Sequence, residues 1–441
     1  MLERSSPFQC PISSACLMGI SDRLVQEKVS AAMFRDTALD LLEEHSRRTD
    51  SDPSSATQDE AFWMGVRSAF ALDSDTINFN NGGCSPSPRV VADSLKQQID
   101  YANKAPSIFM WRDLDPKIEG VRKRLASLFG ADSEEIAITR NASESLMTCL
   151  FGLPMSPGDE LLTTSQDYPR MINAIRQRER REGIKMVAID VPVAPSDAAG
   201  VVEAFERAIT SRTKLILISH VVFMTGQINP VREICDLGKK HGIPVVVDGA
   251  HAIAQFAFGQ PDLNCDYYGS SLHKWLMAPI GTGLLYVKRE LIDDLWALMA
   301  PGPTQDPDIR KFEEIGTHQA AVHNAIDEAL TFHEMLGIER KSARLRYLRS
   351  RWTDRVSELS NVKFHTNLAP DHSCGICTVE IEGIEVGDLA GWLEKNYQIV
   401  VAPIEHHQFR GLRISPQVYT SLAEVDRFAE AIIMAAIHGI S

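Results

Sequence analysis

The sequence lacks the features that mark secreted and membrane proteins. Its eight cysteines are spread over 441 residues, too thinly for a disulfide framework, so a reducing cytosol fits better. No apolar run reaches the roughly 20 residues that a membrane-spanning helix needs. The apolar stretch of residues 8–20 contains Pro11 and follows little positive charge. We therefore predict neither an export signal nor a membrane span, and we expect a cytoplasmic protein.

Positive charge is also scarce. Lys and Arg total 45 against 59 Asp and Glu, which gives a net charge of -14. Such a chain repels phosphate backbones, so we do not expect nucleic acid as a partner. Cys374 and Cys377 have the spacing of a metal or redox pair, but they adjoin an alternating, strand-like run and no second pair lies nearby. We predict a structural role for both cysteines and no metal site.

Short apolar segments alternate with helix-prone segments through the middle of the chain. The segments with strand character are residues 76–80, 136–139, 160–163, 186–189, 215–218, 245–248 and 283–287, and the helix-prone ones include 171–182, 202–209 and 231–241. This alternation predicts an α/β fold whose mostly parallel sheet lies between helices. Ligands of such sheets bind at the carboxyl ends of the strands.

The pattern changes after about residue 310. A long helical region at 320–359 precedes strand-like segments at 377–381, 398–402 and 411–415, and a final helix is expected at 422–437. These features predict a smaller α+β domain at the C-terminus. We divide the chain into an N-terminal helical arm (1–75), a large domain (76–320) and a small C-terminal α+β domain (321–441).

Lys274 stands in a context that is unusual for a surface lysine. Ser271 and His273 precede it, Trp275 follows it, and the turn of residues 279–283 comes next. A lysine in an apolar pocket or near other cations has a lowered pKa, so its amine can act as a nucleophile. The alternative interpretation is an ordinary lysine at the edge of a loop.

Asp248 ends the apolar segment of residues 245–248, which places its carboxylate at the edge of the predicted sheet. A carboxylate there is costly without a partner, and a protonated pyridine nitrogen would serve; helix capping is the alternative. The segment from Thr139 to Ser145 follows another strand and could form an anion cradle at a helix N-terminus, or simply cap that helix.

These segments, taken in order, resemble the class V aminotransferase-like enzymes of fold type I. These enzymes depend on pyridoxal 5′-phosphate (PLP), and they include cysteine desulfurases, kynureninase and isopenicillin N epimerase. The resemblance covers residues 78 to about 420 and is strongest toward isopenicillin N epimerase-like members. It rests on residues 78–83, 141–144, 167–169, 219–220, 225–226, 248–251, 271–274, 312–317 and 412–415.

The resemblance implies a PLP site in the large domain. Lys274 would hold the cofactor as a Schiff base and move protons at the substrate Cα, and Asp248 would pair with the pyridine nitrogen. Tyr168 would stack on the ring, and His251 would lie near the phenolic oxygen. The phosphate would be bound by Ala142, Ser143, Ser271 and His273.

Other implied roles concern the substrate and a second subunit. Arg413 would clamp the substrate carboxylate as a bidentate fork, with Asn81 and Gly82 nearby; a surface salt bridge is the alternative for this arginine. Thr317 would reach the phosphate of the neighbouring subunit, which implies a homodimer with shared sites.

The sequence departs from the family at two places. Phe223 stands where relatives often carry an Asn that contacts the phenolic oxygen. Residues 400–411 align with the desulfurase loop that carries a reactive cysteine, but they contain none. We therefore do not expect a cysteine desulfurase. His406 and His407 of this segment could face the substrate, or they could be a solvated pair.

The resemblance implies an enzyme, and we expect an epimerase or racemase of an amino acid or an amino-acid-containing metabolite. The alternative is a carbon–sulfur or other carbon–heteroatom lyase, or an aminotransferase, on the same scaffold. A binding or regulatory module is a third hypothesis, which the intact Lys274, Asp248 and Arg413 argue against. The second proton donor that epimerisation needs could be Tyr168, His251, His220 or His406.

Overall fold

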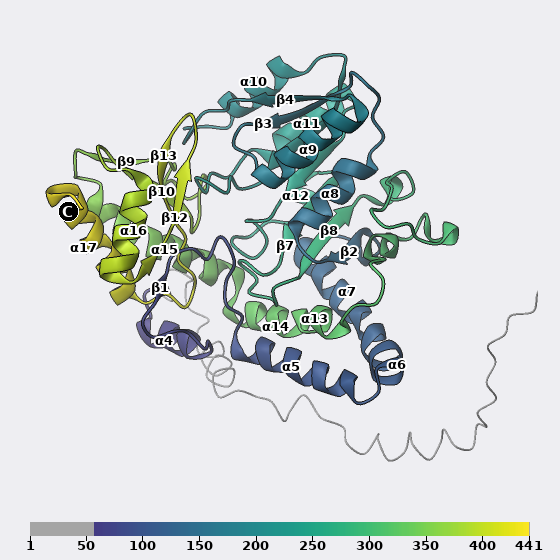
Figure 1. The fold of residues 1–441 in the computed structure, drawn as a ribbon, viewed down its shortest axis with the longest axis horizontal. Helices are drawn as coiled ribbons and strands as arrows, with labels where there is room; N and C mark the ends of the chain where they lie inside the picture. The colour runs from purple at the N-terminus through teal and green to yellow at the C-terminus, as the bar shows by residue number, and fades with distance from the viewer. Residues whose placement is uncertain (1–56, 441) are drawn as a thin grey trace, which may run out of the picture.

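The structure, a computed structural model, describes residues 57–440 (Figure 1). The apolar stretch at 8–20 and most of the predicted N-terminal arm lie outside these residues. Within residues 57–440, no helix combines the length and the apolar character that crossing a membrane requires.

A seven-stranded sheet forms the centre of the molecule, and it confirms the predicted α/β fold. Six strands run in one direction, and β8 alone in this sheet runs antiparallel to the neighbours on both sides. The order is β2 (Ile136–Thr139), β8 (Gly283–Val287), β7 (Tyr267–Ser271), β6 (Val245–Asp248), β5 (Thr213–Ser219), β3 (Glu160–Thr164) and β4 (Lys185–Ile189). The strands predicted between residues 136 and 287 are therefore present, and β7 is the strand that brings the chain back toward Lys274.

Helices cover both faces of this sheet, so its strands carry apolar residues at successive positions. In β5, Leu215 and Leu217 pack into one buried cluster with helices α8 (Ala142–Gly152) and α9 (Pro169–Glu182). Ile216 and Ile218 enter the opposite cluster, which contains α7 (Ile118–Phe129), α10 (Ala199–Ala208) and α11 (Val231–His241). Burying each of these side chains contributes roughly 1.5–3 kcal/mol.

The C-terminal part contains a second sheet, as the pattern predicted. Its order is β12 (Ala402–Glu405), β13 (Arg410–Ile414), β10 (Cys377–Ile381) and β9 (Val362–Phe364), all antiparallel. The sheet shares a buried cluster with α15 (Ile338–Val356), α16 (Val386–Tyr397) and α17 (Leu422–His438). Cys374 and Cys377 are buried beside and within β10.

The helical region predicted at 320–359 is three helices rather than one. They are α13 (Ala320–Asn324), α14 (Ile326–Leu336) and α15, and Gly337 separates the last two with a φ of 72°. Only glycine adopts this conformation readily, which explains the break. Helix α14 packs with α5 (Arg89–Asn103) in the cluster of the large sheet. The domain division at residues 75 and 320 stays a prediction.

Helix α4 (Glu60–Ser68) connects the chain before the first motif to the C-terminal part. Arg67 donates two 2.8 Å hydrogen bonds to Glu424 at the start of α17, and Arg344 of α15 pairs with Glu60. Strand β1 (Ile77–Asn78) then pairs in parallel with β11 (Ile399–Val400). These contacts hold the turn at residues 80–83 between the two sheets.

Short elements complete the described fold. They are α6 (Pro106–Ile108), the π-helix η2 (Phe109–Leu114), α12 (Gln260–Leu263) and the 3₁₀ helices η3 (Asp115–Lys117), η4 (Ser133–Glu135), η5 (Arg289–Leu291), η6 (Pro303–Gln305) and η7 (Ile309–Glu313).

Candidate active site

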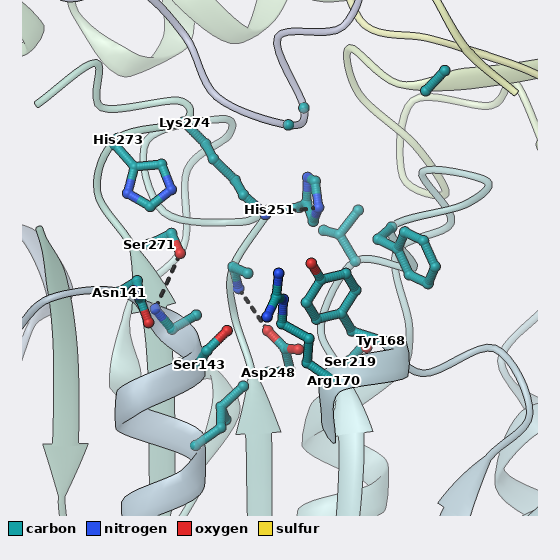
Figure 2. Close-up of a pocket in the computed structure, with 18 of the residues that line it drawn as sticks. Asn141, Ser143, Tyr168, Arg170, Ser219, Asp248, His251, Ser271, His273 and Lys274 are labelled. Atoms are coloured by element: carbon teal, nitrogen blue, oxygen red, sulfur yellow. Dashed lines mark hydrogen bonds between the residues drawn. The ribbon is translucent and has the colours of Figure 1, made fainter. Parts of the chain in front are cut away.

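A cavity of about 600 Å³ opens where the carboxyl ends of the parallel strands meet the smaller sheet. Strands β5, β6 and β7 contribute Ser219, Asp248 and Ser271 from their last positions, and the smaller sheet contributes Arg413. Ten residues predicted for the site line this one cavity: Gly82, Ala142, Ser143, Tyr168, Asp248, His251, Ser271, His273, Lys274 and Arg413. Most of them are drawn in Figure 2.

Asp248 is buried at the end of β6, with 6% of its surface exposed. One carboxylate oxygen accepts a 3.0 Å hydrogen bond from the N–H of Ala250 (Figure 2). Turns follow Asp248 rather than a helix, so the helix-cap interpretation is wrong. Burial raises the pKa of Asp248 to about 6, although the Ala250 N–H and the Lys274 ammonium oppose this shift. A pyridinium nitrogen would provide the cation that this carboxylate requires.

A second carboxylate, Asp167, fixes the strand ends beside Asp248. It accepts hydrogen bonds from the side chain of Thr163, from the N–H and side chain of Thr164, and from the N–H and side chain of Ser219, at 2.6–2.9 Å. These five bonds use the oxygens of Asp167 and tie β3 to β5. Asp167 therefore positions the next residue, Tyr168, and is not available for acid–base chemistry.

Lys274 follows β7 and faces the cavity, so it is not an ordinary loop-edge lysine. Its Nζ lies 3.1 Å from Nε2 of His251. Burial lowers the pKa of Lys274 to about 8, with Asp248 opposing the shift and Arg413 reinforcing it. Burial also holds the pKa of His251 well below its usual value, so this imidazole is neutral. Its Nδ1 is buried and has no hydrogen-bond partner in the described chain.

Helix α8 presents its N-terminus to the cavity. Asn141 caps the helix by accepting a 2.9 Å bond from the N–H of Glu144, and the N–H of Ala142 donates a 3.0 Å bond to the hydroxyl of Ser271 (Figure 2). Ser143 and His273 line the same part of the cavity. Hydroxyl groups beside the positive end of a helix suit a phosphate group. With Asp248, Lys274 and the unpartnered Nδ1 of His251, these residues fit PLP.

Arg413 projects from β13 into the cavity and has 7% of its surface exposed. It donates a 2.6 Å bond to the side-chain oxygen of Asn80 and a 3.1 Å bond to the carbonyl of Phe223. It pairs with no carboxylate of residues 57–440 and is buried, so the surface salt-bridge interpretation is wrong. Its Nε is buried without a partner in the described residues, and burial lowers the pKa of Arg413 to about 10. A charged guanidinium with a free donor fits a substrate carboxylate.

In the turn at residues 80–83, the residue that lies near Arg413 is not the predicted one. Gly82 lines the cavity, but the amide of Asn81 is fully buried and donates to the carbonyls of Asn78 and Ser415 at 2.9 and 3.0 Å. Asn81 therefore fixes the turn, and Asn80 is the residue that contacts Arg413. Two adjacent asparagines give no sequence signal that separates these roles. Arg170 also lines the cavity, and the sequence did not indicate it either.

Two histidines considered as proton donors lie elsewhere. His220 is buried with its Nδ1 3.1 Å from the Tyr268 hydroxyl, and burial lowers its pKa to about 3. His406 lies at the tip of the β12–β13 hairpin, where its Nε2 is 3.1 Å from the carbonyl of Ser165. The neighbouring His407 lies 2.8 Å from a carboxylate oxygen of Asp190. His406 and His407 therefore connect the smaller sheet to the ends of β3 and β4, and they do not face the cavity.

Tyr168 and Phe223 form one wall of the cavity. Their rings meet edge to face, with centroids 5.3 Å apart and planes at 77°. Thr317 is exposed and does not line the cavity of its own chain. Cys84 is the exposed cysteine among those described, and it follows Gly82 and Gly83 of the cavity. No cluster of His, Cys, Asp and Glu that could hold a metal ion occurs within residues 57–440.

Known proteins resemble this chain over most of its length. The Aminotransferase class-V family model matches residues 77–428. Isopenicillin N epimerase from Streptomyces clavuligerus is 29% identical over 84% of this chain and 98% of its own. A probable cysteine desulfurase from Pyrococcus abyssi is 25% identical over 82% and 95%. The cystine C–S lyase C-DES, solved as a mutant with glycine linked to its PLP cofactor, gives a TM-score of 0.74 at 22% identity, covering 82% and 98%.

The lowered pKa of Lys274 predicts how the cofactor-free protein takes up PLP. Only the neutral amine attacks the PLP aldehyde, and a pKa of about 8 means that half of the amine is neutral near pH 8. The rate of covalent PLP attachment, followed by absorbance in stopped flow, should rise with pH and level off above about 8. An ordinary lysine has a pKa of about 10.4. A rate that keeps rising up to that pH would contradict the burial of Lys274.

Proposed function

The chain belongs to the class-V aminotransferase family, and we propose that it is a PLP-dependent epimerase or racemase of an amino acid or an amino-acid-containing metabolite. When bound, PLP draws electrons from the substrate Cα and so acidifies its hydrogen. Inversion at Cα then requires one group to remove this proton and another to deliver a proton on the opposite face. The observation that carries the proposal is that Lys274 and Tyr168 point into the cavity from different sides (Figure 2).

We assign the two proton-transfer roles to these side chains. The amine of Lys274 would act on one face of the substrate, because its lowered pKa lets it both accept and release a proton near neutral pH. The Tyr168 hydroxyl would act on the other face, since His220 and His406 are engaged elsewhere. His251 remains beside Lys274, where the contact between Nε2 and Nζ holds the amine in place and Nδ1 can bind a polar group of the cofactor.

The remaining residues would bind and orient. Asp248 would hold the pyridine nitrogen protonated, and the start of α8 with Ser271 and His273 would bind the phosphate. Arg413 would bind the substrate carboxylate, with Asn80 and the Phe223 carbonyl fixing the plane of its guanidinium. A carboxylate held by Arg413 would fix the orientation of Cα, so that its hydrogen could be directed toward the group that removes it.

A carbon–sulfur lyase is the second candidate. Relatives with this chemistry share the family, and Cys84 is exposed next to Gly82 and Gly83 of the cavity. The β12–β13 hairpin, which stands where we align the cysteine-bearing loop of desulfurases, has no cysteine and is tied to β3 and β4 by His406 and His407. For this reason we propose that the protein is not a cysteine desulfurase.

Incubation with single amino acid enantiomers in D₂O tests the epimerase proposal. We expect deuterium at Cα and inversion of configuration, without release of keto acid, pyruvate or sulfide. Lys274→Ala should lower turnover by roughly 10²–10⁴-fold or more, because it removes an acid–base group. The Tyr168→Phe variant should still exchange the Cα hydrogen when that hydrogen faces Lys274, which is the case for one of the two enantiomers. It should no longer invert the configuration at Cα.

The Tyr168→Phe variant keeps the aromatic ring, so a loss of PLP binding is not expected. Tyr397→Phe, on α16 and away from the cavity, is the matched control and should behave as the unaltered protein. Stoichiometric release of pyruvate or sulfide would instead establish the lyase, and the turnover of Cys84→Ser would then show whether the elimination needs this thiol.

We also propose that the protein is a homodimer. A single chain exposes several large apolar side chains, among them Trp111 (54%), Ile280 (72%) and Trp296 (76%). Such exposed groups mark interaction surfaces, and Ile280 lies six residues after Lys274 (280 − 274 = 6). Thr317, exposed and outside its own cavity, would complete the phosphate site of the partner.

Sedimentation of the PLP-loaded protein checks the dimer. We expect twice the 48.9 kDa of one chain. Thr317→Ala should weaken PLP binding by about tenfold, roughly the loss of one hydrogen bond to a charged group, while the protein stays dimeric. A monomer at micromolar concentration, or unchanged PLP affinity in the variant, would contradict the shared site.

A further inference from the structure

Arg170 lines the cavity without having a role in the site described so far. It is the second residue of α9, directly after Tyr168 and Pro169. Its side chain is exposed and makes no hydrogen bond or ion pair with any residue in the described part of the chain. In Figure 2 it rises beside Tyr168 toward the middle of the cavity. Arg178 and Arg181 of the same helix, in contrast, both pair with Glu182.

The place of Arg170 in its helix is unfavourable for a cation. The first turn of a helix carries the positive end of the helix dipole, which favours anions and disfavours lysine and arginine. The basic residues Arg180 and Arg181 occupy the last turn of α9, where the dipole favours them. Within residues 57–440, no carboxylate forms an ion pair with Arg170. An anion that binds at this point would contact both the guanidinium and the positive end of α9.

The side chains that line the cavity carry more positive than negative charge, which favours binding of such an anion. Among the described residues that line the cavity, three side chains are cationic, namely Arg170, Lys274 and Arg413, and Asp248 alone is anionic. The proposed function uses Lys274 and Asp248 for the cofactor and Arg413 for the α-carboxylate of the substrate. The phosphate would be taken by the start of α8, with Ser271 and His273. Arg170 is therefore the cation that this assignment leaves unmatched.

We propose that the substrate carries a second anionic group, a carboxylate at the end of its side chain, and that Arg170 binds it. This inference rests on the proposed function, because it takes Arg413 as the site of the α-carboxylate. Arg413 is buried, whereas Arg170 is exposed at the mouth. The distal carboxylate thus lies at the entrance, and the apolar side chains of Val221, Phe223 and Ile404 line the cavity and suit a methylene chain.

Binding of two unreactive acids of equal length tests this inference without turnover. Hexanoate has one carboxylate and adipate has two, and neither has an amino group that could react with PLP. Their affinities for the PLP-loaded enzyme can be measured by calorimetry or by the absorbance of the bound cofactor. We expect adipate to bind about tenfold more tightly than hexanoate, which corresponds to about 1.4 kcal/mol, even though adipate is the less apolar acid.

Variants at position 170 should remove this preference specifically. In Arg170→Ala, adipate and hexanoate should bind equally, with the affinities for hexanoate and PLP unchanged. Arg170→Lys should keep part of the preference, because it retains the charge but loses the bidentate fork. Arg176→Ala is the matched control: this arginine is exposed on the same helix but does not line the cavity, and the full preference should remain.

Three results would overturn the inference: no preference for adipate in the unaltered enzyme, a preference that persists in Arg170→Ala, or weaker PLP binding in that variant. The last result would assign the guanidinium to the cofactor phosphate. The outcome is separate from that of the D₂O experiment. An Arg170-dependent preference for adipate without any Cα exchange would leave the anion site standing while rejecting the epimerase proposal.

Discussion

Asp248 ends β6 inside the protein, where a carboxylate is unstable unless a cation accompanies it. The rest of the site is arranged around this requirement. Asp167 holds the neighbouring strand ends through five hydrogen bonds, and β7 returns the chain so that Lys274 enters the same cavity. Because burial raises the pKa of Asp248 and lowers the pKa of Lys274, the cavity favours a ligand that brings its own positive charge to Asp248.

The smaller sheet completes the cavity from the other side, and its position depends on contacts that are far from the cofactor site. Helix α4 pairs with α15 and α17, β1 pairs with β11, and the β12–β13 hairpin contacts the ends of β3 and β4. Together these contacts set the distance between Arg413 and the strand ends of the large sheet. Substrate binding is therefore tied to how the two sheets are held together.

The sequence predicted the sheet and most of the site because buried parallel strands are nearly continuous in Val, Leu and Ile, and their last residues carry the polar groups. Asp248 was found in this way, whereas Lys274 was indicated by its neighbours Ser271, His273 and Trp275, and Arg413 by the family resemblance. Asn80 and Arg170 were missed, since turns and exposed helix starts have no periodic pattern. The break at Gly337 was also missed, because the helical pattern continues on both sides of it.

A lowered pKa alone does not identify the cofactor lysine. Lys341 is fully buried, and burial lowers its pKa to about 7, yet it donates to the carbonyl of Trp275 and does not line the cavity. The most direct measurement is to reduce the PLP-loaded protein with borohydride and to map the modified peptide by mass spectrometry. The account predicts that the pyridoxyl group is on Lys274. A pyridoxyl group on Lys341 or on any other lysine would contradict it.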